Sequence, residues 1–346
     1  MEDTNKRNRD ILLSQGSMLI PAIAYGDAAG LPVETKTAEY ISTTYPEGIS
    51  TLIPTRENSF FESEEHPGVW SDDTQLTLAV AKALIKANGF SLSAFAETHL
   101  EAYDNTPEII RKGNLVKRGW GDSTTSAMVR LLGGVSPTIS GTTGGTGNGV
   151  LIKIAPLAYW QAIRQTPLRQ VYDQYDQLTN MTHNSAVARL TTRVHGDMLA
   201  YLIRNEYDKG RFMAVLEGSL ALHEFETRQS GVVSPGFLRS QLDYLYKTLN
   251  KEIILSETDA SGFYAPQTLA MAYGAFIAHN GEFVPTVFEA VNLGGNTDSL
   301  ASIAASMSIF KTKEVLSLPT DYLNLERLDE LQQVSRQLAT TAFTDA

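Results

Sequence analysis

The feature that most limits the fold is a helical spacing of apolar residues that recurs along nearly the whole chain. Between Ile11 and Ile23 the apolar residues return at intervals that keep one face of a helix apolar. Regular alternation of apolar and polar residues between turn signals, which is typical of half-buried strands, is not evident. The pattern therefore predicts an all-α protein.

The first of these helices should end near Asp27 and Gly30. A second is expected from Ser71 to Asn88, because its aliphatic residues share one face and Gly89 follows its end, where a glycine is favoured. Similar patterns predict helices over 92–103, 123–132, 150–163, 185–207, 212–223, 236–249, 266–279, 284–292, 297–310 and 323–341.

The organisation of the 346 residues favours one domain, although the length is about twice that of a typical domain. No composition shift, proline-rich linker or internal repeat divides the chain, so we expect a single compact helical bundle over 1–346 with a polar N-terminal extension at 1–10. Two segments look irregular. Residues 133–149 are rich in glycine, serine and threonine, and residues 54–68 form either a flap over a site or a solvated loop.

Composition excludes several classes of function. The chain has no cysteine, which rules out disulfides, thiolate metal sites and a cysteine nucleophile. Its 28 basic and 39 acidic residues give a net charge of −11, which disfavours nucleic acid as a partner. No apolar run is long enough for a membrane span, and the N-terminus lacks a secretory core, so we expect a cytoplasmic protein without a membrane partner.

The sequence Ser71-Asp72-Asp73-Thr74 opens the second predicted helix. Its simplest interpretation is a helix cap in which Ser71 accepts a backbone hydrogen bond and two carboxylates complement the helix dipole. Two adjacent acids also present several hard oxygens from one turn, which suits Mg²⁺ or Mn²⁺.

A second turn of the same kind lies at 294–299, with the sequence Gly-Gly-Asn-Thr-Asp-Ser. It leads into the helix over 297–310 and carries the oxygens of Asn296, Asp298 and Ser299. A capped helix is again the simpler explanation. Because both helices are rich in small residues, we expect them to pack closely and bring the two turns face to face around one metal site.

Three further segments offer site residues. Glu34, beyond a rigid proline, is a general acid or base, an outer partner of a metal, or a solvated glutamate. The glycine run ending in Gly147-Asn148-Gly149 is a phosphate cradle or a flexible loop. His183, at a helix start, is a donor to a ligand hydroxyl or an ordinary buried histidine.

Other chemistries lack their signatures. No Walker loop, no pair of histidines at the spacing of a helical zinc site and no Gly-x-Ser-x-Gly elbow is present. The turn over 120–123, Trp-Gly-Asp-Ser, either lines a pocket or caps a helix.

Read in order, these motifs resemble the ADP-ribosylglycohydrolase family, which includes dinitrogenase reductase-activating glycohydrolases and the lens J1 crystallins. The matching segments run from near residue 20 to near residue 305. The resemblance implies a compact all-α domain with two central Mg²⁺ ions, for which Mn²⁺ is a substitute, and cleavage of the bond between ADP-ribose and a protein side chain.

The resemblance also implies a role for each residue. Glu34, Asp72 and Asp298 would be catalytic, with Glu34 as a flap carboxylate near the scissile bond. Gly147, Asn148 and Gly149 would contact the diphosphate or ribose, and His183 the ribose. The metal ligands would be Ser71, Asp72, Asp73, Asp298 and Ser299. We expect an ADP-ribosylated protein, modified on arginine, as the substrate.

The chain departs from the family pattern at three places. Asn296 stands where an aspartate is usual, which removes a negative charge and should weaken at least one metal site. Ser299 replaces a threonine but keeps the hydroxyl. Val150 to Lys153 follow the glycine run where alanine, methionine and arginine are usual.

Other functions remain open on the same scaffold. One is a binding or immunity protein that blocks an ADP-ribosyltransferase, which Asn296 favours. The others are a structural protein like the lens crystallins and a hydrolase of a different glycoside.

Overall fold

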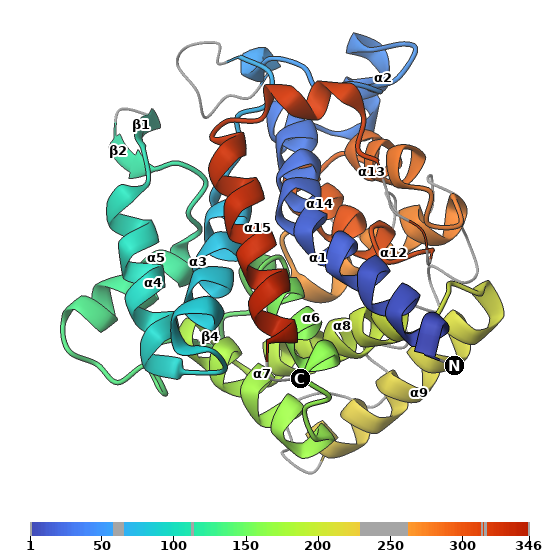
Figure 1. Cartoon of the computed structure of the whole chain (residues 1–346). Coiled ribbons are helices and arrows are strands. Elements are labelled where there is room, and N and C mark those ends of the chain that lie inside the picture. The colour runs from blue at the N-terminus through green and yellow to red at the C-terminus, as the bar shows by residue number, and fades with distance from the viewer. Residues whose placement is uncertain are drawn as a thin grey trace.

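The protein is described from a computed structural model that covers residues 2–57, 66–111, 114–228, 262–312, 314 and 317–344. The architecture is all-α, as the sequence predicts (Figure 1). The helices present within these ranges are α1 (Glu2–Gly30), α2 (Ala38–Thr44), α3 (Asp72–Ala87), α4 (Leu92–Asn105), α5 (Asp122–Leu132), α6 (Ala155–Ile163), α7 (Leu168–Thr182), α8 (Ala186–Arg204), α9 (Lys209–Arg228), α12 (Ala265–Ala278), α13 (Phe283–Asn292), α14 (Thr297–Ser308) and α15 (Leu328–Phe343).

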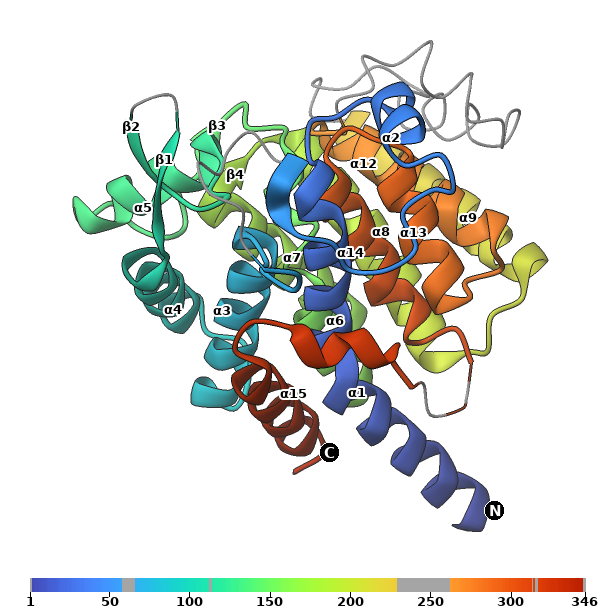
Figure 2. The ribbon, with the colours of Figure 1, turned by 90° about the horizontal axis from the view of Figure 1, so that it is seen from above.

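Helix α1 runs through the middle of the fold and packs against α14 and α15 (Figures 1 and 2). Glycines allow the close approach of α1 to α14. A Cβ atom at Gly26 would lie 2.4 Å from the carbonyl oxygen of Ala301, so the two helices touch through their backbones. Small residues on both helices thus bring the C-terminal end of α1 beside the N-terminal end of α14.

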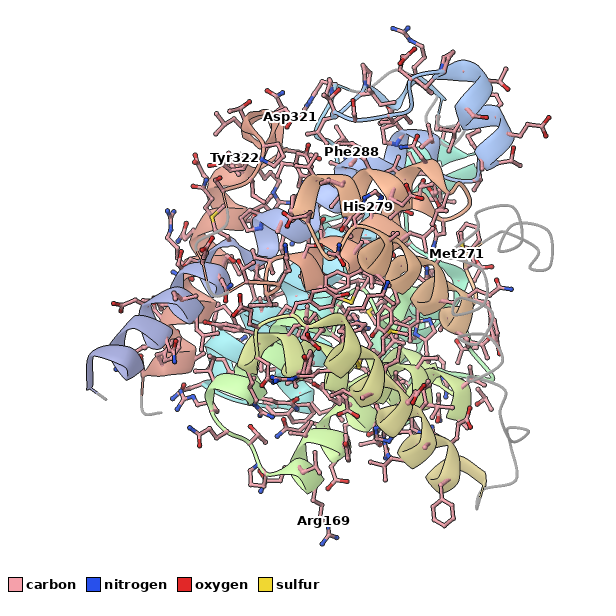
Figure 3. The ribbon with its side chains drawn as sticks, turned by 90° about the vertical axis from the view of Figure 1, so that its right-hand side faces the viewer. Arg169, Met271, His279, Phe288, Asp321 and Tyr322 are labelled. Carbon is pink, nitrogen blue, oxygen red and sulfur yellow. The ribbon has the colours of Figure 1, made fainter. Side chains whose placement is uncertain are left out.

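The remaining helices surround this central pair. Helices α3 and α4 pack together on one side, while α12 and α13 pack against α14 on another, where Figure 3 shows Met271, His279 and Phe288. Helices α6, α7, α8 and α9 form a further group, while α5 packs against α4 and α7, and α2 contacts α13. The buried apolar side chains of all these elements join in one continuous core, which includes stacked aromatic rings such as Phe212 and Phe276.

Several elements differ from the prediction. Helix α7 was not predicted, although Val171, Tyr175 and Leu178 recur at helical spacing on its buried face, because many polar residues separate them and the segment has a low apolar content. Helix α2 has only 7 residues and was also not predicted. Helix α6 begins at Ala155 rather than at residue 150, because Asn148–Val150 forms a separate 3-10 turn, η3.

Short strands are also present, although none was evident from the sequence. The strands β1 (Glu108–Arg111) and β2 (Asn114–Lys117) form an antiparallel hairpin, and β3 (Thr142–Thr143) pairs in parallel with β4 (His183–Asn184). Strands of two to four residues are too short to produce a recognisable alternation. The helix predicted over 236–249 lies outside the described residues, as do residues 58–65 of the predicted flap.

The first helix starts earlier than predicted, at Glu2, so the polar segment at 1–10 continues α1 from its second residue. In the described ranges, no helix has the length and apolar character needed to cross a membrane.

Candidate functional site

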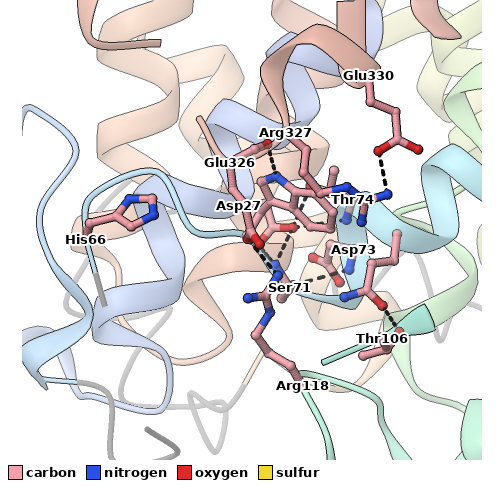
Figure 4. A network of polar contacts seen from close by, with 12 residues as sticks. Asp27, His66, Ser71, Asp73, Thr74, Thr106, Arg118, Glu326, Arg327 and Glu330 are labelled. Carbon is pink, nitrogen blue, oxygen red and sulfur yellow. Dashed lines mark hydrogen bonds and ion pairs between the residues drawn. The ribbon is translucent and has the colours of Figure 1, made fainter. Parts of the chain in front are cut away.

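Three helix ends meet where the two acidic turns were predicted. Asp27, fully buried near the end of α1, accepts hydrogen bonds from the first turn of α3 (Figure 4). Both of its carboxylate oxygens lie 2.9 Å from the backbone nitrogen of Ser71, and Oδ2 also accepts from the backbone nitrogen and the hydroxyl of Thr74, at 3.0 and 2.7 Å. An acid from one helix therefore caps the next and fixes the direction of Asp72 and Asp73.

The second turn is held against the end of α1 in a similar way. The Thr297 hydroxyl donates to the carbonyl oxygen of Gly30 at 2.7 Å. Gly294 and Gly295 adopt φ values of +75° and +81°, which favour glycine, and the Gly295 carbonyl accepts from the Thr35 backbone at 2.7 Å. The turn before α14 is thus bonded to the residue that follows Glu34.

A layer of aromatic and basic side chains supports the turn at 71–73. The Trp70 indole nitrogen donates to the Glu326 carbonyl at 2.7 Å, and its ring lies 5.5 Å from the guanidinium carbons of both Arg118 and Arg327. Arg118 also pairs with the Glu326 carboxylate at 2.8 Å (Figure 4). This packing holds the residue before Ser71 rigidly in place.

These turns enclose a cavity of about 180 Å³. It brings together nearly all of the predicted site residues, and its lining comprises Glu34, Asp72, Asp73, Gly119, Gly121, Asp122, Ser123, Thr124, Gly147, Asn148, Gly149, His183, Phe263, Asn296, Asp298 and Ser299. Ser71 is not part of this lining. It is fully buried, and its hydroxyl accepts from the Asp73 backbone at 3.2 Å, as a helix cap does.

Electrostatics in the cavity disfavour three ionised carboxylates. Burial, followed by the charge of Asp298, raises the pKa of both Asp72 and Asp73 well above its usual value. Burial, followed by the charge of Asp27, raises the pKa of Asp298 to about 7. The hydroxyls of Ser71 and Ser299 lie near Asp298 and Asp73, respectively, and oppose these shifts, so each turn reaches the acids of the other.

The donor set suits a hard cation, although the side chains do not already form a complete metal shell. Oδ2 of Asp73 is buried without a hydrogen-bond partner, and the neighbouring acids repel it. Carboxylate and hydroxyl oxygens are the ligands that Mg²⁺ prefers. In the ranges described, no three acidic or histidine side chains converge closely enough to count as a preformed metal cluster. Binding a cation would therefore require these side chains to draw together.

The glycine run and His183 form another part of the cavity wall. A Cβ atom at Gly149 would lie 3.2 Å from Cε1 of His183, and one at Gly147 would lie 3.7 Å from Nε2. Asn148 anchors this loop through two hydrogen bonds. Its side-chain nitrogen donates to the carbonyl oxygen of Gly262 at 3.3 Å, and its backbone nitrogen donates to the carbonyl oxygen of Phe263 at 3.1 Å. The loop thus sits tightly over the imidazole ring.

The site includes residues that sequence reasoning did not assign. Gly119, with φ of +81°, lies so close to Asp72 that a Cβ atom would fall 2.5 Å from its Oδ1. The predicted turn over 120–123 contributes Gly121, Asp122 and Ser123 to the cavity, so its pocket-lining interpretation is confirmed. Asp27 was noted only as the end of a helix. In the sequence, these residues were marked only as glycines or acids near a predicted turn or helix end.

An outer cleft of about 570 Å³ opens beside the inner cavity and shares Glu34 and Asp122 with it. It reaches the β1–β2 hairpin, where Glu108 and Lys117 line it together with Trp120. Glu34 therefore stands where the inner cavity meets the wider cleft.

A larger groove, of about 630 Å³, lies between α6, α7, α8 and α9. Its one carboxylate, Asp197, already accepts hydrogen bonds from Ser219 and His223, at 2.6 and 2.9 Å. The smaller cavity, with its cluster of acids, is therefore the better candidate for chemistry.

Comparison with known proteins agrees with this geometry. A family model for ADP-ribosylglycohydrolase matches residues 18–342. The chain belongs to the ADP-ribosylglycohydrolase family. An uncharacterized protein of Archaeoglobus fulgidus is 22% identical over 321 residues, which make up 92% of this chain and 94% of the relative. The solved structure of an ADP-ribosylglycohydrolase-related protein complex superimposes with a TM-score of 0.68 and 22% identity, covering 97% of this chain and 99% of that one.

The family resemblance seen in the sequence is thus confirmed, as is the all-α fold. Membership of the ADP-ribosylglycohydrolase family supports a hydrolase-type role for this chain. The structural likeness, at 22% identity, shows the fold alone.

Proposed function

We propose that this member of the ADP-ribosylglycohydrolase family is a cytoplasmic, Mg²⁺-dependent hydrolase that removes ADP-ribose from protein side chains, with arginine as the modified residue. The observation that carries the proposal is the convergence of Asp72, Asp73 and Asp298 in one cavity with Glu34 and His183. The residue types are those that the family resemblance implies, and the cavity is the one place in the described ranges where they meet.

The proposed metal ligands come from the two facing turns. Asp72, Asp73 and Asp298, with the hydroxyls of Ser299 and Ser71, would hold one or two Mg²⁺ ions. Bound metal would supply orientation of the ribose hydroxyls and activation of a water molecule. The carboxylates also offset the positive charge that develops on the ribose when the glycosidic bond breaks.

The other residues would bind and orient the substrate. Gly147 and Gly149 leave the backbone open to the diphosphate, and Asn148 holds this loop in place. His183 would donate a hydrogen bond to the ribose. Glu34, between the inner cavity and the outer cleft, would hold or accept a proton near the scissile bond, with the modified protein lying in the outer cleft.

One observation favours a second candidate function, that of a binding or immunity protein that blocks an ADP-ribosyltransferase. The side-chain nitrogen of Asn296 donates to the hydroxyl oxygen of Ser299 at 3.1 Å. The amide therefore occupies a proposed metal ligand and removes the charge that an aspartate would provide. Weaker metal binding and slow turnover would follow.

The deciding experiment measures free ADP-ribose released from an arginine-ADP-ribosylated protein, with Mg²⁺ or with a chelator. We expect Mg²⁺-dependent release. Asp72→Ala and Asp298→Ala should abolish metal-dependent binding of ADP-ribose, while Glu34→Ala should leave binding intact and slow turnover. Asp329→Ala is the matched control, because Asp329 is also in the first turn of a helix but is exposed.

The outcomes separate the two functions. Unchanged binding in both aspartate variants would refute the metal site, and a fully active Glu34→Ala would remove Glu34 from the mechanism. Binding of ADP-ribose without release, together with co-purification of a transferase, would favour the immunity function. In that case Asn296→Asp should strengthen Mg²⁺ binding, because it restores a carboxylate beside Ser299.

A further inference from the structure

A buried lysine lies beside the proposed substrate site and has no part in the function described above. Lys153 follows the glycine loop by four residues, and its side chain is fully buried. Its ammonium nitrogen donates to the hydroxyl oxygen of Thr182 at 3.0 Å. The same hydroxyl lies 3.0 Å from Nδ1 of His183. The three side chains thus form a continuous hydrogen-bonded chain that ends on the wall of the cavity.

When the lysine is charged, only one arrangement of the hydrogens in this network gives an acceptor to every donor of Thr182 and His183 that takes part in it. An ammonium group has three hydrogens to donate and no lone pair to accept. The Thr182 oxygen therefore accepts from Lys153. Its second lone pair could also accept from an Nδ1–H, but the hydroxyl hydrogen would then be buried without an acceptor among the described residues. Donation of that hydrogen to Nδ1 of His183 satisfies every group. Nδ1 must then carry a lone pair, which leaves the hydrogen of the neutral ring on Nε2.

In this tautomer the His183 ring can donate a hydrogen bond into the cavity. His183 is buried but lines the cavity, and burial lowers its pKa to about 3, so the ring is neutral at physiological pH. Gly149 lies against Cε1 and Gly147 near Nε2, so a larger residue at Gly149 would crowd the ring. In the described ranges, Nε2 has no protein hydrogen-bond partner. An N–H at this position is therefore available to an oxygen of a bound ligand.

We propose that Lys153, acting through Thr182, is a positioning residue that holds His183 in the Nε2–H form and so makes it a hydrogen-bond donor to a hydroxyl or phosphate oxygen in the cavity. The identity of that ligand as ADP-ribose rests on the proposed function. The tautomer itself does not, because it follows from contacts within the protein.

The tautomer is measured directly by NMR on protein with ¹⁵N-labelled histidine, since a nitrogen that carries hydrogen is distinguished from one with a lone pair. His183→Gln identifies the signals. Burial lowers the pKa of Lys153 to about 7, so the ammonium form prevails at about pH 6. We expect a single Nε2–H form in the unsubstituted protein and in Thr182→Ser. In Thr182→Val and Lys153→Met we expect a mixture of the two tautomers.

Binding of ADP-ribose, measured by calorimetry, tests the consequence. Loss of one directed hydrogen bond predicts affinity about threefold to tenfold weaker in Thr182→Val than in Thr182→Ser. The valine variant keeps the shape of threonine, so it remains informative if Lys153→Met does not fold.

A pure Nε2–H form in both Thr182→Val and Lys153→Met would overturn the proposal, and a pure form in Lys153→Met alone would overturn the role of the lysine. Equal affinities in the valine and serine variants would overturn the link to the ligand. If the unsubstituted protein bound no ADP-ribose, the proposed function would fail while the tautomer result still stood.

Discussion

Gly30→Ala should disturb the candidate site without touching any of its side chains. A Cβ atom at Gly30 would lie 2.3 Å from the carbonyl carbon and oxygen of Thr297 and 2.4 Å from the backbone nitrogen of Asp298. Ordinary contacts of a Cβ atom begin near 3.4 Å, so the first turn of α14 must move by about 1 Å. The φ of −86° at Gly30 suits alanine, so the effect comes from space alone.

The magnitude follows from that displacement. Overpacking of this kind lowers the free energy of unfolding by about 1–3 kcal/mol. A shift of about 1 Å in Asp298 would also reduce turnover by roughly 100-fold, because catalytic groups tolerate little misplacement. Affinity for Mg²⁺ should fall as well, since Asp298 and its neighbour are proposed ligands.

Urea unfolding and calorimetric titration with Mg²⁺ and ADP-ribose test this prediction. Gly218→Ala is the control, because Gly218 lies in α9 and a Cβ atom there meets nothing within 4 Å. Alanine at that position should be neutral or should stabilise the helix by up to about 1 kcal/mol. If Gly30→Ala were as stable as Gly218→Ala and bound both ligands normally, the argument from backbone contact would be wrong.

Two further changes test the buried polar groups. Asp27→Asn places an amide nitrogen among the donors of Ser71 and Thr74, so the free energy of unfolding measured in urea should fall by about 2–4 kcal/mol. The exposed Asp329→Asn should change this free energy little. Equal stability of the two variants would contradict the capping role of Asp27. Burial lowers the pKa of His195 from 6.5 to about 3, so the unfolded chain binds the proton first and stability falls as pH decreases between these values. This histidine should contribute a loss of about 1.6 kcal/mol between pH 6.5 and 5, and a pH profile of unfolding that is unchanged in His195→Gln would show that it does not.

Local patterns in the sequence were enough to predict most of the helices. Apolar residues at helical spacing identify α3 and α14, and in α3 the Ser71 cap and Gly89 also mark the two ends, because these signals act within a few residues. Helix α7 was not predicted because polar residues dominate the segment, although its few buried residues keep helical spacing. The β1–β2 hairpin escaped because four residues carry no clear period.

The residues of the candidate site could also be predicted from the sequence. Paired acids, a glycine loop and a histidine are short motifs whose order along the chain identifies the family, and the cavity contains all but one of the residues named from them. The exception, Ser71, turned out to cap its helix from a position outside the cavity lining. Its bond to the Asp73 backbone is the local interaction that its sequence position predicts.

Other features depend on contacts between residues far apart in the chain. Asp27 became the cap of α3 only because α1 ends beside it, and α1 reaches α14 closely only because Gly26 and Gly30 carry no side chain. The link from Lys153 to the cavity likewise requires α7 to end beside the glycine loop. Helical spacing and residue chemistry are local and can be read from the chain, whereas burial, hydrogen-bond partners and shifted pKa values arise only when distant segments exclude water from one another.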